Sequence, residues 1–168
     1  WTSLRGTLVV SVICALIAGT VGLLIGYGVA KKRKSKMASG VNALAFLPYL
    51  LPSITLSAIF FDMASTFSAA GFKFLYRNPM FLAILLGSIK FIPFASRSAT
   101  NAMLQLSNEI EEAAVIQNVP WWKRMTRVIF PIQKSSFLSG YLLPFISCMR
   151  EYDLFLFIGG NGMLLTKQ

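Results

Sequence analysis

Residues 7–30 read TLVVSVICALIAGTVGLLIGYGVA, a run of 24 residues without one charged side chain. At about 1.5 Å per residue, a helix of this length spans about 36 Å and can cross a hydrocarbon core of roughly 30 Å. The run contains four glycines, at positions 19, 22, 26 and 28. Small residues at such spacing allow a second helix to approach closely, although a glycine-rich span without a specific partner remains an alternative.

Three further apolar segments predict membrane spans, at residues 41–62, 79–97 and 133–156. The first of these contains Pro48 and Pro52. Proline removes a backbone donor and clashes with the preceding turn, so two prolines in one run predict a kink or a break. Such a break inside a membrane requires protein or water around it.

Charged residues near the third span have two interpretations. Lys90 interrupts the span, and its long stem favours snorkelling toward an interface, with a functional intramembrane charge as the alternative. Residues 65–78 are mixed in character and contain Lys73 and Arg77. This segment predicts an external loop with a short surface helix.

The composition excludes a small water-soluble domain. The 168 residues are 55% hydrophobic and 13% charged, with a mean hydropathy of +0.64, whereas soluble domains carry roughly 25% charged residues. The net charge of +10 lies in clusters beside apolar runs, which is typical of topology signals and not of nucleic-acid binding. The chain has no histidine, and Cys14 and Cys148 lie in apolar runs as small buried hydrophobes. We therefore expect no metal site, no cofactor and no nucleic-acid partner.

The distribution of Lys and Arg predicts the orientation. Residues 31–36 and 97–134 fall on one side of the predicted topology and hold ten of the sixteen positive charges, against four on the other side. This asymmetry places both segments in the cytoplasm, the first as an anchor or an anionic-lipid contact. With its N-terminus outside and no signal peptide, we expect the chain to be a piece of a longer protein. It would lack at least one span before Trp1 and one after Gln168.

The polar segment at residues 100–131 predicts a helix, a bend and a second short helix along the cytoplasmic surface. Ser107 or Asn108 can cap the first helix, and the glutamates that follow complement the helix dipole. Asn118 tolerates the left-handed conformation found at helix ends. Pro120 can open the second helix, and Pro131 marks the return to the membrane.

Residues 111–131 read EEAAVIQNVPWWKRMTRVIFP and resemble the signature loop of binding-protein-dependent ABC importer permeases of type I, the MetI-like family. That signature is Glu-Ala-Ala, three residues, Gly, nine residues, Ile, one residue and Leu-Pro. The spacing is kept here, with Asn118 for Gly, Val128 for Ile and Phe130 for Leu. Residues 4–8, 47–52 and 91–98 also resemble the family, so the resemblance covers nearly the whole chain.

The resemblance implies an all-α, polytopic membrane protein, a MetI-like bundle of about four to five transmembrane helices formed by a single domain at residues 1–168. The loop would be a coupling helix that docks on a cytoplasmic ATP-binding subunit dimer. The residues implied in that contact are Glu111, Glu112, Ala113, Ala114, Asn118, Val128, Phe130 and Pro131. The other implied partners are a periplasmic or lipoprotein solute-binding protein, a second permease half or second copy, and inner-membrane lipid.

The chain lacks a G-x-x-x-x-G-K-[ST] loop, so we expect no enzyme activity in it and ATP hydrolysis by a separate subunit. A passive channel or a structural membrane subunit is the alternative class.

The sequence after the fourth span bears on the solute. Residues 149–152 read MREY and resemble an Arg-Glu pair in permeases of the ferric-iron branch, which favours ferric iron as the solute. Polyamine, phosphonate, sugar and sulfate remain alternatives. Arg150, Glu151 and Asp153 are candidates for the translocation path or its gate, and an ion pair that stabilises the fold is the alternative.

Overall fold

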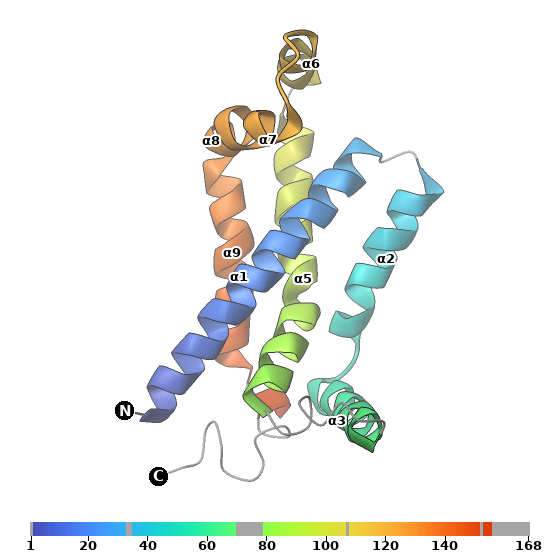
Figure 1. Ribbon diagram of the computed structural model, residues 1–168, viewed down its shortest axis with the longest axis vertical. Coiled ribbons are helices and arrows are strands. Elements are labelled where there is room, and N and C mark those ends of the chain that lie inside the picture. The colour runs from blue at the N-terminus through green and yellow to red at the C-terminus, as the bar shows by residue number, and fades with distance from the viewer. Residues whose placement is uncertain (1, 33–34, 70–78, 107, 152, 156–168) are drawn as a thin grey trace.

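The computed structural model describes residues 2–32, 35–69, 79–106, 108–151 and 153–155, and within these ranges the regular structure is helical throughout (Figure 1). The elements are α1 (Thr2–Lys31), α2 (Lys36–Leu50), α3 (Ser53–Ala69), α5 (Pro79–Gln105), α6 (Asn108–Ile116), α7 (Trp121–Arg124), the π-helix η1 (Met125–Ile129), α8 (Phe130–Ile132) and α9 (Lys134–Arg150). The predicted all-α class is confirmed.

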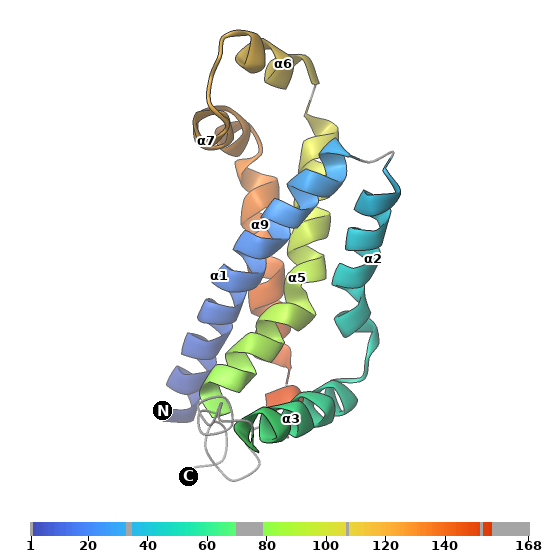
Figure 2. The same ribbon diagram turned by 45° about the vertical axis from the view of Figure 1, so that its right-hand side comes forward.

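Three long helices form the centre of the bundle. α1 crosses over α5 in the most extensive contact between helices, and α9 packs against both (Figure 2). α2 lies against α5. One buried cluster joins these helices toward the α3 end and includes Leu86 and Phe91, and another lies beneath the loop of α6 and α7 and includes Ala102 and Phe137.

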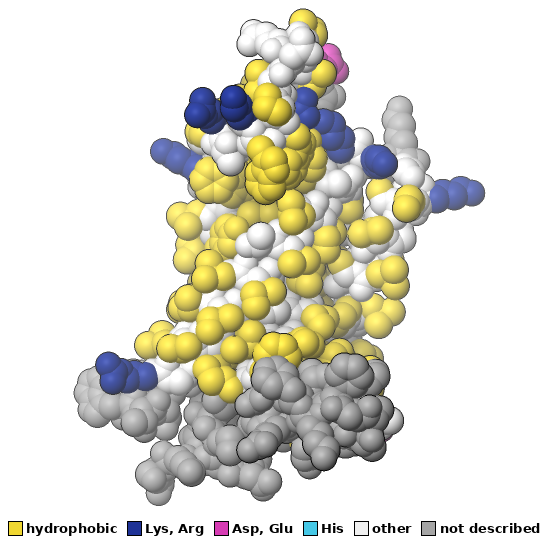
Figure 3. Space-filling view, viewed as in Figure 1, with side chains coloured by type: hydrophobic (Ala, Val, Ile, Leu, Met, Phe, Trp, Pro, Cys, Tyr) yellow, Lys and Arg dark blue, Asp and Glu magenta, His cyan; other side chains and the backbone are white. Residues whose placement is uncertain are grey.

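The outer surface of the bundle is apolar, as expected of helices that face lipid tails. Large hydrophobic side chains such as Leu16, Leu44 and Leu138 are exposed. On the face seen in Figure 3, hydrophobic side chains cover the middle of the molecule, and most of the visible Lys and Arg side chains lie near the end that carries α6 and α7. The C-terminal end of α1 and the N-terminal end of α2 lie at this same end (Figure 1). The two basic segments of the sequence therefore meet at one end of the bundle, as the predicted orientation requires.

Within the described residues, two helices are long and apolar enough to cross a membrane, at Arg5–Lys31 and Met80–Gln105. A third crossing is broken, because Lys36–Leu50 and Ser53–Met63 meet at an angle of 100°. The break expected from the two prolines is thus present, with Pro48 inside α2 and Pro52 immediately before α3. α9 has 17 residues, and the predicted fourth span extends beyond it to residues outside the described ranges.

The structure differs from the expectation at two places. Residues 65–78 were expected to form an external loop with a short surface helix, but residues 65–69 continue helix α3 from the preceding segment, and residues 70–78 lie outside the described ranges. Lys90 does not snorkel to an interface, because it is 5% exposed. Its side chain stays inside the bundle because its ammonium group has two hydrogen-bond acceptors there, as described below.

The glycines of α1 determine how closely it approaches α5. A Cβ added to Gly22 would lie 2.5 Å from the Cβ of Ala95 and 2.9 Å from the carbonyl oxygen of Ile92. A Cβ added to Gly26 would lie 2.6 Å from the Cβ of Ala99. Real Cβ atoms do not approach so closely, so these two glycines form a packing face, as small residues do in many membrane helix pairs. A Cβ at Gly28 would meet nothing within 4 Å.

We expect Gly22→Ala to lower the thermal unfolding midpoint of the detergent-purified protein and Gly28→Ala to leave it unchanged or raise it. Both substitutions gain helix propensity worth about 1 kcal/mol. Only the first forces a methyl group against α5, an overpacking that costs about 1–3 kcal/mol. Equal midpoints for the two variants would show that the α1–α5 contact does not depend on the missing Cβ.

Candidate functional site

The segment between α5 and α9 projects from one end of the bundle. α6 stands beyond the ends of the long helices, and α7 and α8 turn back beneath it toward α9 (Figures 1 and 2). α6 takes part in none of the extensive contacts between helices in the described chain. The predicted helix, bend and second helix are all present, although α5 continues to Gln105 before the segment begins.

The bend after α6 is built from local hydrogen bonds. Asn118 has a φ of 53°, the one positive φ of a non-glycine residue in the described ranges. Its backbone N–H donates to the carbonyl of Val115 at 2.9 Å, and the N–H of Val119 donates to the carbonyl of Ala114 at 3.0 Å. These two bonds define a Schellman motif, in which a left-handed residue closes the last turn of a helix. The geometry explains why Asn can stand where the family signature has Gly.

The exposed surface of α6 is mixed in character. Glu112 and Ala113 are exposed, and Ala114 is almost covered. Ile116 is 79% exposed, an unusual position for a large apolar side chain at a helix end beyond the bundle. Glu111 belongs to the same helix, but its side chain lies outside the described part of the structure. Carboxylate, small and apolar groups are therefore displayed together on this projecting helix.

The second half of the segment anchors it to the bundle. The ring of Trp121 meets that of Tyr27 on α1 at a centroid distance of 6.0 Å. Ile129 is buried in the cluster that joins the end of α5 to α9. Phe130 is partly exposed and stacks on Phe137 of α9 at 5.5 Å. The loop is thus coupled mechanically to α1, α5 and α9.

Sequence reasoning missed the π-helical turn η1 in this anchor. Its backbone bonds include the N–H of Phe130 donating to the carbonyl of Met125, five residues earlier. π-Helical turns are rare and often mark functional segments, but no residue type in this stretch signals one.

Two further positions were expected to act in docking. Val128 is half-buried within η1, and Pro131 is exposed.

A second polar site lies toward the other end of the bundle. The ammonium group of Lys90 donates to Glu151 Oε1 at 2.9 Å and also to Ser53 Oγ. The side chains of the ion pair are only 6% and 17% exposed. Arg150 and Asp153, which we grouped with Glu151 as path or gate candidates, are exposed. The structure thus brings Glu151 together with Lys90, a pairing that the sequence analysis did not foresee.

Comparison with known proteins gives the family. A family model described as the binding-protein-dependent transport system inner membrane component matches residues 22–167. The chain belongs to this family. The predicted family, the membrane helical bundle and the multi-pass location in the inner membrane are therefore confirmed.

Several transport proteins are similar to this inner-membrane component. It is 25% identical over 162 residues to a probable sulfate transport system permease protein of Chlorokybus atmophyticus, covering 92% of this chain and 56% of that protein. It is 24% identical over 165 residues to a putative ferric transport system permease protein of Haemophilus influenzae, covering 94% and 24%. It is 25% identical over 166 residues to a molybdenum transport system permease protein of Azotobacter vinelandii, covering 95% and 73%. The chain thus spans about half the length of the first relative and about a quarter of the second.

Metal binding by the candidate site of this inner-membrane component would require a group of metal-binding side chains. Among the residues that the structure describes, no group of three or more His, Cys, Asp or Glu side chains could hold a metal ion. What the described residues offer is a projecting helix at one end and a buried ion pair toward the other.

The Schellman turn predicts a graded response to substitution at position 118. We expect Asn118→Gly to retain or strengthen the protection of the Val119 amide from hydrogen exchange, because glycine adopts positive φ without strain. Asn118→Val should weaken that protection by about 1–2 kcal/mol, because a β-branched side chain is strained there.

The control is Gln117→Val, one residue earlier, where the backbone φ is not positive. This variant should leave the protection of Val119 close to that of the parent protein. If both valine variants behaved alike, the turn would not depend on the left-handed conformation of residue 118.

Proposed function

We propose that this inner-membrane component is one permease half of an ATP-driven importer, and that α6 is the element on which a cytoplasmic ATP-binding subunit acts. The observation that carries the proposal is a projecting helix in the signature segment. That helix is closed by its own turn and anchored through aromatic and apolar contacts to three spans. Its position at the basic end of the bundle supports a cytoplasmic location.

The docking contact would use the exposed positions of α6 and its turn. Glu112 and Ala113 supply a carboxylate and a small surface that a groove can accept, and Asn118 fixes the direction of the chain that follows. The segment that joins this contact to α9 contains Val128, Phe130 and Pro131, which would support the contact from the side of the bundle. Glu111 is included from its place in the signature segment.

Movement of the loop would be converted into a change in the packing of the spans. A partner can shift a two-state equilibrium only by binding one packing better than the other. Closure of an ATP-binding subunit dimer against two copies of α6 would provide that difference. The proposed partners are therefore two ATP-binding subunits, a second permease half or a second copy of this chain, and an external solute-binding protein.

We propose a small inorganic ion as the cargo, with ferric iron as the first candidate. Two observations support this class: the Arg150–Glu151 pair resembles the ferric-iron branch, and the relatives described above are named for sulfate, ferric and molybdenum transport. None of those three is named for a polyamine, a phosphonate or a sugar. An oxyanion such as sulfate is the second candidate, because one of the three relatives is named for sulfate transport.

We expect Glu112→Lys to abolish solute-stimulated ATP hydrolysis by the assembled transporter while membrane insertion stays intact. The substitution reverses an exposed charge on the proposed docking face without touching the buried clusters. ATP hydrolysis would be measured in proteoliposomes with and without the loaded binding protein.

The matched control is Glu109→Lys, which makes the same charge change on the same helix but outside the signature. It should retain most of the stimulation. Normal stimulation in Glu112→Lys would reject the docking role of this face.

The cargo is tested by uptake into proteoliposomes that contain the permease, the ATP-binding subunit and the binding protein. Uptake of radiolabelled ferric iron should exceed that of sulfate and molybdate and should require ATP. Preferred uptake of an oxyanion would show that the cargo is that oxyanion and not iron. Flux through the permease without the ATP-binding subunit would identify a passive channel instead.

A further inference from the structure

The buried cluster of Ser53, Lys90 and Glu151, here called the outer latch, lies where two helices are interrupted. Ser53 begins α3 directly after the break that separates α3 from α2. Glu151 is the residue after α9, and its backbone N–H donates to the carbonyl of Cys148. Lys90 lies within α5 and reaches both, with its ammonium group donating to the hydroxyl of Ser53 and to the carboxylate of Glu151.

The two charges of the latch pair with each other away from solvent. Their side chains are 6% and 17% exposed, and they lie beside a cluster of buried apolar side chains. An unpaired charge in such surroundings is strongly unfavourable, so the pair resists separation in this packing of the helices. A change of packing that lets water reach this end would lower the cost of separating them.

The latch holds α3 near the start of that helix. Besides the hydroxyl of Ser53, the contacts of α3 with the bundle include Leu56, which is buried in the cluster with Leu154 and Phe155, and Ser57, whose hydroxyl lies 3.4 Å from the carbonyl oxygen of Leu154. Farther along α3, Ile59 and Met63 are exposed. α3 takes part in none of the extensive contacts between helices in the described chain. These contacts all lie in the first two turns of α3.

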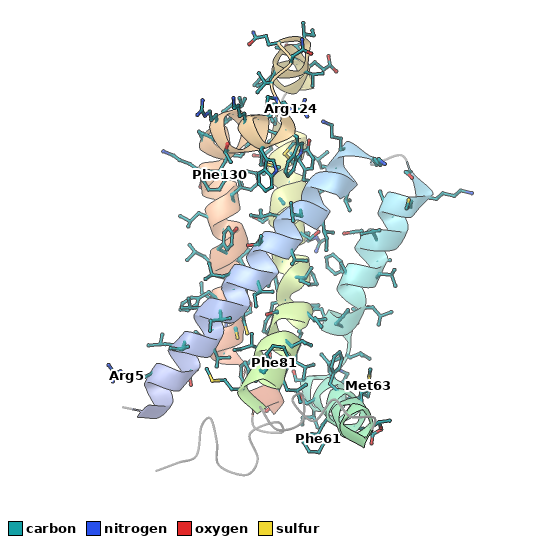
Figure 4. All side chains as sticks on the ribbon, in the orientation of Figure 1. Arg5, Phe61, Met63, Phe81, Arg124 and Phe130 are labelled. Carbon is teal, nitrogen blue, oxygen red and sulfur yellow. The ribbon has the colours of Figure 1, made fainter. Side chains whose placement is uncertain are left out.

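The same two helices flank both the latch and the docking loop. α5 carries Lys90 and runs on to the loop, and α9 starts after the loop and ends next to Glu151. Figure 4 shows Arg124 and Phe130 at the loop end and Phe61 and Met63 on α3 at the opposite end. A rigid displacement of α5 relative to α9 that is imposed at the loop would change the distance between the two charged groups.

We infer that the outer latch is the element that locks α3 in place, and that it opens when the docking loop shifts α5 against α9. This inference rests on the proposed importer function and assigns positioning roles to Lys90, Glu151 and Ser53. With the ion pair formed, α3 covers this end of the bundle. With the pair separated, α3 is released and the bundle can adopt the other packing.

The test uses the complete transporter, with its ATP-binding subunits and binding protein, in proteoliposomes. The main variant is Lys90→Met with Glu151→Met, which removes both charges and leaves none unpaired, so it is expected to fold. Without the latch, ATP hydrolysis in the absence of solute should rise about five- to tenfold, and the ratio of stimulated to basal hydrolysis should fall accordingly.

Two further variants separate a latch from a purely structural role. The exchange Lys90→Glu with Glu151→Lys restores an ion pair of opposite direction and should recover much of the wild-type ratio. Arg97→Met removes a positive charge from an exposed position of the same helix and should leave the ratio unchanged. A structural role alone would lower the yield of folded protein without changing the ratio.

The outcomes are distinct. A methionine pair with wild-type basal hydrolysis and a wild-type ratio would overturn the latch while leaving the importer intact. An increase caused equally by Arg97→Met would also overturn it, because the effect would then follow from charge loss in general. If the wild-type assembly itself showed no solute-stimulated hydrolysis, the importer function would fail first.

Discussion

The close approach of α1 to α5 is the constraint on which the bundle depends. In lipid, helices gain little from burying apolar side chains against one another, so backbone proximity and polar contacts must hold them together. At Gly26 the backbone of α1 comes so near to α5 that the hydroxyl of Thr100 donates to its carbonyl at 3.3 Å. The single proton of that hydroxyl is shared with the carbonyl of Ser96, which lies nearer at 2.8 Å. α5 is fixed by this contact, and the other helices and the loop are placed relative to α5.

Polar contacts concentrate where the backbone of a span is interrupted or ends. The turn after α6 satisfies its own carbonyls, and the break before α3 brings a serine hydroxyl to a buried ammonium group. Elsewhere in the spans, hydroxyls such as those of Thr20 and Ser88 donate to carbonyls four residues earlier in their own helix. Such bonds within a helix offset part of the cost of placing a polar group in the hydrocarbon region, where water is absent.

Features set by local chemistry were predictable from the sequence. The break follows from the fixed φ and the missing donor of two prolines, and the turn at Asn118 follows from the tolerance of asparagine for positive φ. The spacing of the glycines indicated a packing face but did not show which glycines belong to it. In the structure Gly22 faces a neighbouring helix, whereas Gly28 faces open space. The partner of Lys90 was not predictable, because 61 residues separate it from Glu151 and only the tertiary packing unites them. The π-helical turn was not predictable from residue types, because only a small difference in free energy separates it from an α-helical turn.

The Schellman turn has a consequence for the strength of subunit association. Its hydrogen bonds lie within residues 114–119, so the shape of the turn is already present before any partner arrives. A segment that must become ordered on binding loses conformational entropy and therefore affinity, whereas a preorganised one does not. In the proposed importer, the free energy of contact at this surface would therefore be available to shift the packing of the membrane helices and would not be consumed in ordering the chain.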